Sequence, residues 1–244
     1  MTHDVAMTET RQPNGSVLAV CSGRTTVMTH GSRSTRTGFL KQPHEGRVEI
    51  GPLGIDTDEH VYEHHGGPDM ALLVYSVDHY AHWRSLGLSL PECAAFGENL
   101  TVTGLTETDV HIGDTFRVGT CTVQVCQPRT PCSKLAIRFG RRDMAVLMQD
   151  TGFTGYLLRI LETGTIGAGD TMTLIDREAH GITVAAAGRT VSVERNDLEA
   201  ARTLLALPAL GSAVRRTLTA RVAEQTAPGA LPLGLDERRL FGAD

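Results

Sequence analysis

The segment CTVQVCQPRTPCSKLAIRFG runs from Cys121 to Gly140. It begins with the alternating side-chain pattern of a strand, continues with a loop that contains two prolines, and ends in a short helical pattern. In its first part, CTVQVCQ, the side chains of Cys121, Val123 and Val125 share one face of a predicted strand, because successive strand residues point to opposite faces. Similar β-branched runs, separated by Gly, Pro and Asp, recur at 17–21, 47–51, 70–76, 99–105, 115–119, 155–164 and 170–177. Many short strands with frequent turns predict a mainly β fold, either a barrel or a sandwich.

Helical patterns are few and gather towards the C-terminal end. One helix is expected at 77–86, within the β region. After Arg177 the composition becomes rich in Ala, and three short helices are predicted. We therefore predict these parts: a leader over 1–15, a β domain over 16–178, a small three-helix domain over 179–225 and a mobile tail over 226–244.

The bulk composition excludes several classes of protein. The chain has 244 residues, a hydrophobic fraction of 41% and a formal net charge of −5, so a nucleic-acid polymer is not an expected partner. No apolar run reaches the roughly 18 residues of a membrane-spanning helix, and the N-terminal residues lack the apolar core of a secretory signal, so we expect a cytoplasmic protein. The odd number of cysteines, five, argues against a disulfide framework, and the absence of a CxxC pair argues against a paired-cysteine zinc site.

Cys132 lies in the loop that contains the two prolines. Pro128 and Pro131 each fix a backbone angle, and Ser133 is the expected N-cap of the helix that follows. A helix end and nearby cations favour thiolate over thiol, so the pattern favours a functional sulfur over a buried cysteine that only packs. The residues alone leave open whether Cys132 acts as a nucleophile or as a metal ligand.

A second candidate site is the stretch HGGPD. Gly66 and Gly67 permit backbone conformations closed to other residues, and free N–H groups in such a turn can bind an anion. His65 can donate to an oxyanion and Asp69 can orient it, although a tight loop with a solvated histidine gives the same pattern. In the stretch FGEN, Asn99 can bind a ligand amide or only close a turn.

Together these stretches resemble the MOSC family, named after the C-terminal domain of molybdenum cofactor sulfurases, and most closely its YiiM-like branch. The resemblance is carried by TGFLKQP (37–43), GPLGIDTDEH (51–60), HGGPDMALLVYSVDHYAHW (65–83), FGENLTVTGLTETDVHIGDTFRVG (96–119), QPRTPCSKLAIRFG (127–140) and TGYLLRILETGTIGAGD (154–170). It covers roughly residues 17–225. It implies a MOSC-type β-barrel followed by a small C-terminal three-helix domain.

The resemblance also implies a molybdenum cofactor, molybdopterin, whose metal takes the sulfur of Cys132 as protein ligand. It makes Cys132, His65 and Asp69 the candidate catalytic residues. The candidate cofactor-binding residues are Lys41, Gly66, Gly67, Asn99, Arg129, Lys134 and Arg138, and the cations among them are candidates for the pterin phosphate. Met70 stands where the family often has Lys, and HVY (60–62) replaces a segment that often ends in QAD.

The activity implied by this branch is the reduction of N-hydroxylated compounds, such as hydroxylaminopurine-type base analogues, to amines. Electrons would come from a separate reductase, because the chain has no GxGxxG turn that opens a helix and no plant-type iron–sulfur spacing. Cys132 also fits a sulfur-carrier or cofactor-handling protein, and HGGPD with Arg129 fits a module that only binds a phosphorylated ligand. The C-terminal helices are candidates for forming a homodimer or for docking the reductase.

Overall fold

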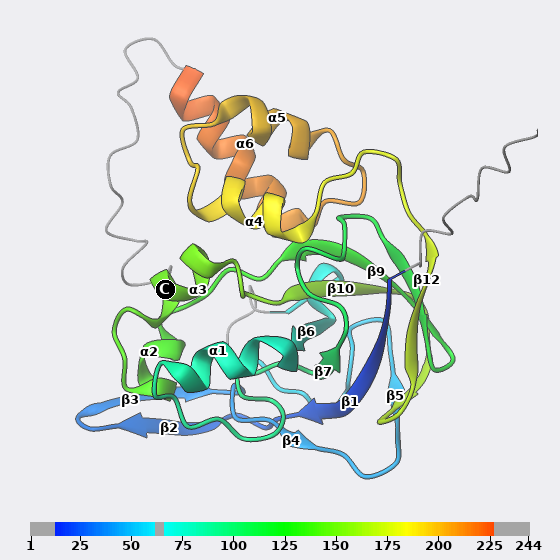
Figure 1. Cartoon of the computed structure of the whole chain (residues 1–244), viewed down its shortest axis with the longest axis vertical. Helices are drawn as coiled ribbons and strands as arrows, with labels where there is room; N and C mark the ends of the chain where they lie inside the picture. Colours follow the sequence, from blue (N-terminus) through cyan, green and yellow to red (C-terminus); the bar gives the residue numbers. More distant parts are fainter. Residues whose placement is uncertain (1–12, 62–65, 227–244) are drawn as a thin grey trace, which may run out of the picture.

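A closed seven-stranded β-barrel forms the centre of the computed structural model, which describes residues 13–61 and 66–226 (Figure 1). The strands follow the order β12-β8-β9-β10-β6-β7-β1 around the barrel, β1 pairs with β12 to close it, and β4 extends the sheet beyond β1. These strands are β1 (Asn14–Ser22), β4 (Gln42–Pro43), β6 (Leu72–Ser76), β7 (Leu100–Thr103), β8 (Thr115–Val118), β9 (Cys121–Pro128), β10 (Tyr156–Glu162) and β12 (Thr171–Asp176). Neighbouring strands are antiparallel, except that β6 and β7 run parallel.

The seam of the barrel lies between its first and last strands. β1 begins at Asn14, inside the range predicted as a leader, because Asn14, Gly15 and Ser16 pair with Thr173, Met172 and Thr171 of β12. Leader residues 1–12 and nearly all of the predicted tail lie outside the described residues. The predicted mainly β barrel followed by C-terminal helices is confirmed.

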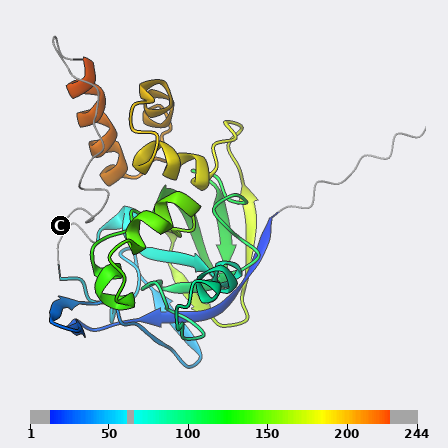
Figure 2. The ribbon, with the colours of Figure 1, turned by 60° about the vertical axis from the view of Figure 1, so that its left-hand side comes forward.

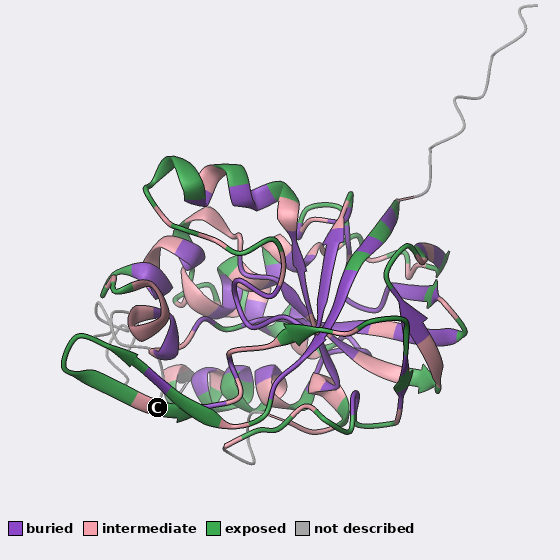
Figure 3. Cartoon of the chain, turned by 90° about the horizontal axis from the view of Figure 1, so that it is seen from below, coloured by how far each residue is buried: buried purple, intermediate pink, exposed green. Residues whose placement is uncertain are grey.

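The central strand β9 is buried on both faces. Cys121, Val123 and Val125 belong to the barrel core, as the alternation predicts. Thr122 and Cys126, on the opposite face, are buried as well, and the helix α4 (Val184–Ser192) packs against this strand. Figure 3 shows the barrel strands as the most extensively buried part of the chain. Because β9 is buried on both faces, the start of the loop that follows it is held in a fixed position.

Two further strand pairs lie outside the barrel. β5 (Arg47–Ile50) pairs with β11 (Gly164–Gly167), and β2 (Thr26–His30) pairs with β3 (Arg33–Thr37). The β2–β3 hairpin is not among the predicted strands. Its side chains are mostly exposed and polar, so it carries no apolar face from which alternation can be recognised (Figure 3).

Three helices pack beside the barrel around an aromatic core. They are α1 (Tyr80–Ser85), which follows the 3-10 turn η3 (Val77–His79) as the sequence predicts, α2 (Lys134–Phe139) and α3 (Met144–Thr151). The rings of Tyr75 and Phe96 stack at 4.3 Å between centroids, and the indole of Trp83 donates to the hydroxyl of Tyr75 at 2.6 Å. Burial of such large rings fixes the start of α2 and the loop before it against the barrel.

The C-terminal helices group at one end of the barrel, as both views show (Figures 1 and 2). They are α4 (Val184–Ser192), α5 (Leu198–Leu205) and α6 (Ser212–Thr226). Asp197 caps α5 by accepting from the N–H of Ala200 at 2.8 Å, as predicted. Apolar side chains of all these helices join the same buried cluster as the barrel core, so barrel and helices pack as one body. Within the described residues, no helix is long and apolar enough to span a membrane.

Candidate functional site

A cavity of about 590 Å³ opens where the barrel, the loop after β9 and the C-terminal helices meet. Its polar and charged lining from the barrel side includes Lys41, Glu59, His60, Asn99, Arg129, Cys132 and Lys134. Its apolar lining includes Phe39, Met70, Leu73, Phe96, Leu157, Val191 and Val214. The volume is in the range of pockets that enclose small organic ligands.

Cys132 is half-buried and lines this cavity. Its loop is held at the base, since the N–H of Arg129 donates to the carbonyl of Gly155 at 3.0 Å and Pro128 pairs with Tyr156 of β10. The carbonyl of Cys132 accepts from the N–H of Leu135 at 3.1 Å, in the first turn of α2. Ser133 stands at the N-cap position of α2 as predicted, but its backbone is helical and its side chain makes no capping hydrogen bond.

Two buried cations flank the sulfur. The guanidinium of Arg129 donates to the carbonyl of Phe96 at 3.3 Å, and it forms no ion pair with a carboxylate of the described residues. Burial lowers the pKa of Arg129 and of Lys134, and negative charge on the Cys132 sulfur opposes both shifts. Arg129 is therefore a cation on the cavity wall that forms no ion pair with a carboxylate of the described residues, and an anionic ligand would complete it.

Lys41 and Asn99 are predicted site residues whose side chains already bind other residues of the protein. The ammonium of Lys41 is paired with the carboxylate of Asp58, and both side chains are almost fully buried. Asn99 donates from Nδ2 to Asp58 Oδ2 at 2.9 Å and accepts at Oδ1 from the N–H of Leu73 at 3.0 Å. Asp58 belongs to the stretch GPLGIDTDEH, but sequence reasoning missed its role as the partner that fixes Lys41 and Asn99.

The stretch HGGPD lies beside the cavity, but its residues have different roles. His65 lies outside the described residues. Gly67 has φ of 112° and ψ of 173°, a conformation that is almost restricted to glycine. Gly66 lies against the ring of His60, whose Cδ2 would be 3.1 Å from an added Cβ. Met70, at the position of the family's lysine, lines the cavity with an apolar side chain.

Asp69 points away from the cavity lining and towards the C-terminal helices. Its carboxylate pairs with Arg159 at 2.8 Å and accepts from the N–H of Ser212, the first residue of α6, at 2.8 Å. Burial alone would raise the pKa of Asp69, but the hydrogen bonds from Ser212 and the charge of Arg159 outweigh it and leave the pKa lowered. Asp69 thus positions the HGGPD turn rather than facing a ligand.

Arg138 is not part of the cavity lining. Its guanidinium carbon lies 5.7 Å from the centroid of the Phe139 ring, on the side of α2 that packs within the aromatic core. Of the cations predicted to hold a phosphate, Lys41, Arg129 and Lys134 are therefore brought to one cavity and Arg138 is not.

Comparison with known proteins agrees with this arrangement. Residues 61–173 match the family described as MOSC domain, and residues 182–225 match the family described as YiiM-like, 3-alpha helix domain. The uncharacterized protein YflK of Bacillus subtilis is 39% identical over 207 residues, which cover 84% of this chain and 93% of YflK. This chain belongs to the MOSC family.

Other relatives of this MOSC protein include the protein YiiM of Escherichia coli, 41% identical over 140 residues, which cover 54% of this chain and 61% of YiiM. A fungal protein named reductase, from Gibberella moniliformis, is 36% identical over 67% of this chain, but the match covers only 30% of that longer protein. The crystal structure of YiiM from Geobacillus stearothermophilus superposes with a TM-score of 0.72 and 31% identity, covering 85% of this chain and 99% of that one.

The YiiM-like helical part of this MOSC protein forms a wall of the cavity that sequence reasoning missed. From it, the lining receives Val191, Ser192, Arg195, Ala213, Val214, Arg216, Thr217 and Arg221. Their pattern looks like the solvated face of a helix bundle, and no local signal distinguishes it from one. The cavity thus has cationic residues on its barrel wall and on its helical wall.

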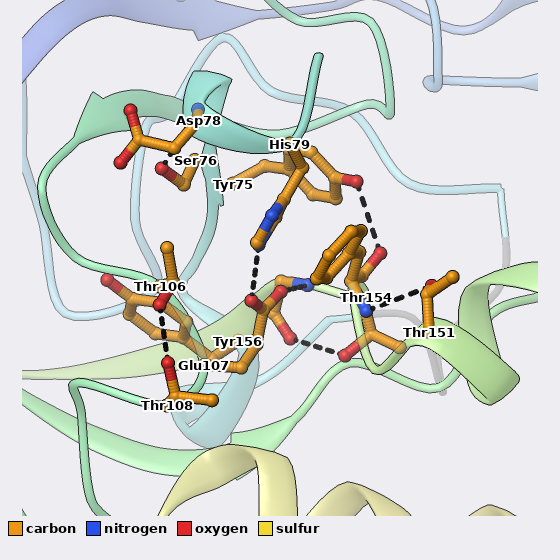
Figure 4. Close-up of polar contacts among 12 residues, drawn as sticks. Tyr75, Ser76, Asp78, His79, Thr106, Glu107, Thr108, Thr151, Thr154 and Tyr156 are labelled. Atoms are coloured by element: carbon orange, nitrogen blue, oxygen red, sulfur yellow. Dashed lines mark hydrogen bonds and ion pairs between the residues drawn. The ribbon is translucent and has the colours of Figure 1, made fainter. Parts of the chain in front are cut away.

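A second polar cluster of the MOSC barrel lies outside the cavity lining (Figure 4). His79 Nε2 and Glu107 Oε2 are 2.6 Å apart, and Glu107 Oε1 accepts from the N–H of Gly155 at 2.6 Å. The ring of His79 stacks on Phe153 at 3.8 Å between centroids. These contacts tie η3 to the loop before β10, so they support the anchor of the Cys132 loop.

Proposed function

We propose that this MOSC protein is a molybdenum-cofactor-dependent reductase of N-hydroxylated compounds, with hydroxylaminopurine-type base analogues as the substrate class. The observation that carries the proposal is the half-buried sulfur of Cys132 at a 590 Å³ cavity beside the buried cations Arg129 and Lys134. The fungal relative named reductase adds support for a redox activity. The name of the family itself links such domains to the molybdenum cofactor.

The residues present fit that cofactor. A thiolate is a soft ligand of the kind that suits a redox-active transition metal, and Cys132 offers one at the cavity. Within the described residues no group of three or more His, Cys, Asp or Glu side chains is placed to hold a metal ion, so the remaining ligands would come from the cofactor. Arg129 and Lys134 would hold its anionic groups, because both cations lie near the sulfur.

The reaction has a definite balance. The N–O bond of the substrate breaks, the oxygen leaves as water, and the amine forms with the uptake of two electrons and two protons. When bound, the molybdenum cofactor supplies the two-electron chemistry. The electrons would come from a separate reductase, as the sequence leads us to expect.

The residues of the chain would bind and orient the substrate. Phe39 and Phe96 give the cavity aromatic surface for a flat base, and Met70, Leu73 and Leu157 exclude water from it. Burial lowers the pKa of His60, so its imidazole is neutral at pH 7 and can accept or donate a hydrogen bond at the cavity. The Lys41–Asp58–Asn99 network holds part of the barrel wall of the cavity in a fixed position.

Metal content tests the ligand assignment. Wild type, Cys132→Ala and Cys93→Ser are purified from a host that makes the molybdenum cofactor, and molybdenum is measured per chain. Cys93 is the matched control, because it is a half-buried thiol outside the cavity lining. We expect only Cys132→Ala to lose its molybdenum. We also expect only this variant to lose the ability to reduce hydroxylaminopurine when a chemical electron donor supplies the electrons. Equal molybdenum in Cys132→Ala and wild type would contradict the assignment.

The same cysteine also fits a sulfur carrier, and a different measurement distinguishes it. After incubation with a cysteine desulfurase, mass spectrometry reports whether sulfur is added at Cys132. A persulfide on Cys132, in a protein that neither retains molybdenum nor turns over hydroxylaminopurine, would favour sulfur transfer over reduction.

A further inference from the structure

Many basic residues of the chain gather on two segments that pack together. Although the net charge is −5, residues 24–37 and 133–142 contain none of the 28 aspartates and glutamates. They contain seven of the 23 lysines and arginines: Arg24, Arg33, Arg36, Lys134, Arg138, Arg141 and Arg142. The first segment forms the β2–β3 hairpin and the second includes α2, which lies against the hairpin (Figures 1 and 2). We call the two segments together the basic face.

A groove of about 420 Å³ runs between the hairpin and the helices α2 and α3. Its polar lining consists of Arg33, Arg142 and the hydroxyl-bearing residues Ser32, Ser34 and Ser133. Arg33 pairs with His30 across the hairpin, and an added Cβ at Gly140 would collide with the ring of His30. Arg33 is thus on the side of the hairpin that faces the end of α2, and Arg142 lines the same groove from the turn before α3.

At the base of the hairpin, the positive charges of the basic face have a carboxylate beside them. Hydrogen bonds from Thr25 and the charges of Arg24 and Arg36 lower the pKa of Glu59. This end of the hairpin is therefore partly neutralised.

In the groove the charges are not balanced in this way. Arg33 and Arg142 are exposed, and neither forms an ion pair with a carboxylate of the described residues. The carboxylate of Asp143 pairs with Arg141 at 2.9 Å, and the described lining of the groove includes no acidic side chain. Two positive charges with hydroxyl groups beside them are hence open to an anionic partner.

The groove and the cavity share one loop. Ser133 lines the groove, and Cys132, the residue before it, lines the cavity. A protein bound at the groove would therefore touch the residue next to the proposed ligand of the metal. This position suits an electron donor, because the rate of electron transfer falls steeply with distance.

We infer that the groove with Arg33 and Arg142 docks the protein that donates the electrons, through an acidic surface of that protein. The basic face, rather than the C-terminal helices, is then the docking surface. Complementary charge steers such encounters, and transient redox complexes have small interfaces, so a few exposed arginines suffice. The hairpin has no aromatic side chain on which bases could stack, which disfavours nucleic acid as the occupant. The inference rests on the proposed function for the role of the partner.

Binding of flavodoxin, an acidic electron carrier, tests the docking surface without any turnover. Calorimetric titration at about 20 mM and about 200 mM salt compares wild type with Arg33→Glu and Arg142→Glu. Arg202→Glu is the matched control, because it makes the same change of charge at an exposed residue of α5 that lines neither the groove nor the cavity. Cytochrome c, a basic electron carrier, is the probe of opposite charge.

We expect wild type to bind flavodoxin at low salt and to lose at least about ten-fold in affinity at the higher salt. Arg33→Glu and Arg142→Glu should each lose at least about ten-fold at low salt, whereas Arg202→Glu should match wild type. Cytochrome c should not bind. No binding of flavodoxin by wild type, or equal affinity in the groove variants and Arg202→Glu, overturns the inference. Unfolding temperatures within about two degrees of wild type exclude a folding defect.

Turnover by cofactor-loaded protein tests the role of the partner. Two one-electron transfers from reduced flavodoxin balance each N–O bond broken, and the two protons come from water. We expect the groove variants to have a raised KM for flavodoxin and an unchanged rate of hydroxylaminopurine reduction with dithionite. An equal loss with both donors overturns the inference. If wild type does not reduce hydroxylaminopurine with dithionite, the proposed function fails and flavodoxin binding alone decides the docking surface. If it does, and the groove variants bind flavodoxin like wild type, only the docking surface fails.

Two other occupants of the groove have their own outcomes. Self-association of wild type in sedimentation at low salt that is lost in Arg33→Glu assigns the groove to a second copy of the chain. A single-stranded oligonucleotide that binds through the same arginines more tightly than flavodoxin assigns it to nucleic acid. Either result overturns the inference.

Discussion

The carboxylate of Asp69 accepts a hydrogen bond from the backbone N–H of Ser212 at 2.8 Å, across a separation of 143 residues. The same carboxylate pairs with Arg159, which also donates to the carbonyl of Ala209 at 3.0 Å. A turn next to the cavity is thereby joined to the first residue of α6, the helix that lines the other wall. The two walls hence keep a fixed relation, which matters for any ligand that touches both.

The replacement Asp69→Asn should weaken this connection. Loss of the charge-assisted bonds to Arg159 and Ser212 is expected to lower the free energy of unfolding by about 1–3 kcal/mol. The pKa of Asp69 is lowered in the folded protein, so its contribution is complete above its unfolded pKa, near 4, and is lost as the pH falls through the folded value.

Urea unfolding of wild type and Asp69→Asn from pH 7 down to pH 3 measures this. The difference between the two proteins should be constant above about pH 4.5 and should shrink below it. Asp143→Asn is the control, because Asp143 pairs with Arg141 at the surface, outside the cavity lining. If the difference in the free energy of unfolding between wild type and Asp69→Asn does not depend on pH, the charge of Asp69 does not have the stabilising role given to it here.

The replacement Arg129→Met should weaken ligand binding and leave the stability of the fold nearly unchanged. Met replaces a buried cation that has no carboxylate partner among the described residues, so the free energy of unfolding should change by less than about 1.5 kcal/mol. Affinity for pyrophosphate, measured by calorimetry, should fall by at least about ten-fold. Arg138→Met provides the comparison from α2, where we expect no change in anion affinity. An unaltered affinity in Arg129→Met would exclude Arg129 from the anion site.

Asp58→Asn should be strongly destabilising, because it leaves the buried ammonium of Lys41 without its counter-charge. The expected loss is about 3–5 kcal/mol at neutral pH. Burial already lowers the pKa of Lys41, and removal of Asp58 would lower it further, so the loss should decrease as the pH rises and Lys41 gives up its proton. Denaturant unfolding at pH 6 and pH 9 measures the trend. The double variant Lys41→Met with Asp58→Asn should lose less free energy of unfolding than the two single variants lose in sum. Additive losses would argue against a coupled pair.

Gly67→Ala and Gly66→Ala form a matched pair in the HGGPD turn. At Gly67 an added Cβ meets no atom of the described residues within 4 Å, so the expected cost comes from the backbone and should be about 1–3 kcal/mol. At Gly66 the added Cβ would press on the ring of His60, which lines the cavity, so we expect ligand affinity to change more than stability. Thermal unfolding together with pyrophosphate titration distinguishes the two effects. Equal unfolding temperatures for Gly67→Ala and wild type would show that the turn relaxes.

The sequence predicted a mainly β fold because most of the strands carry local signals, and the family resemblance then implied the barrel. The alternation around Val123 and Val125 continues into the core, and turn residues separate one strand from the next. The cysteine loop with Arg129 and Lys134 was also predictable, since these residues are neighbours in sequence. Asp58 and the arginines of the helical wall were not, because only tertiary packing places them in one network or one cavity. Arg138, predicted from its proximity in sequence, lies one turn further along α2, away from the lining.

The seam of the barrel has a consequence for how the protein is made. Because Asn14 pairs with Thr173, β1, which leaves the ribosome before the other barrel strands, can complete its pairing only after β12 has emerged. Until then the barrel has two open sheet edges, which are the kind of surface on which chains pair with the wrong partner. Such distant contacts also make folding slow. A stalled ribosome that exposes the chain up to β10 should therefore hold an open, chaperone-dependent sheet, and release of β12 should be the step that protects it from protease.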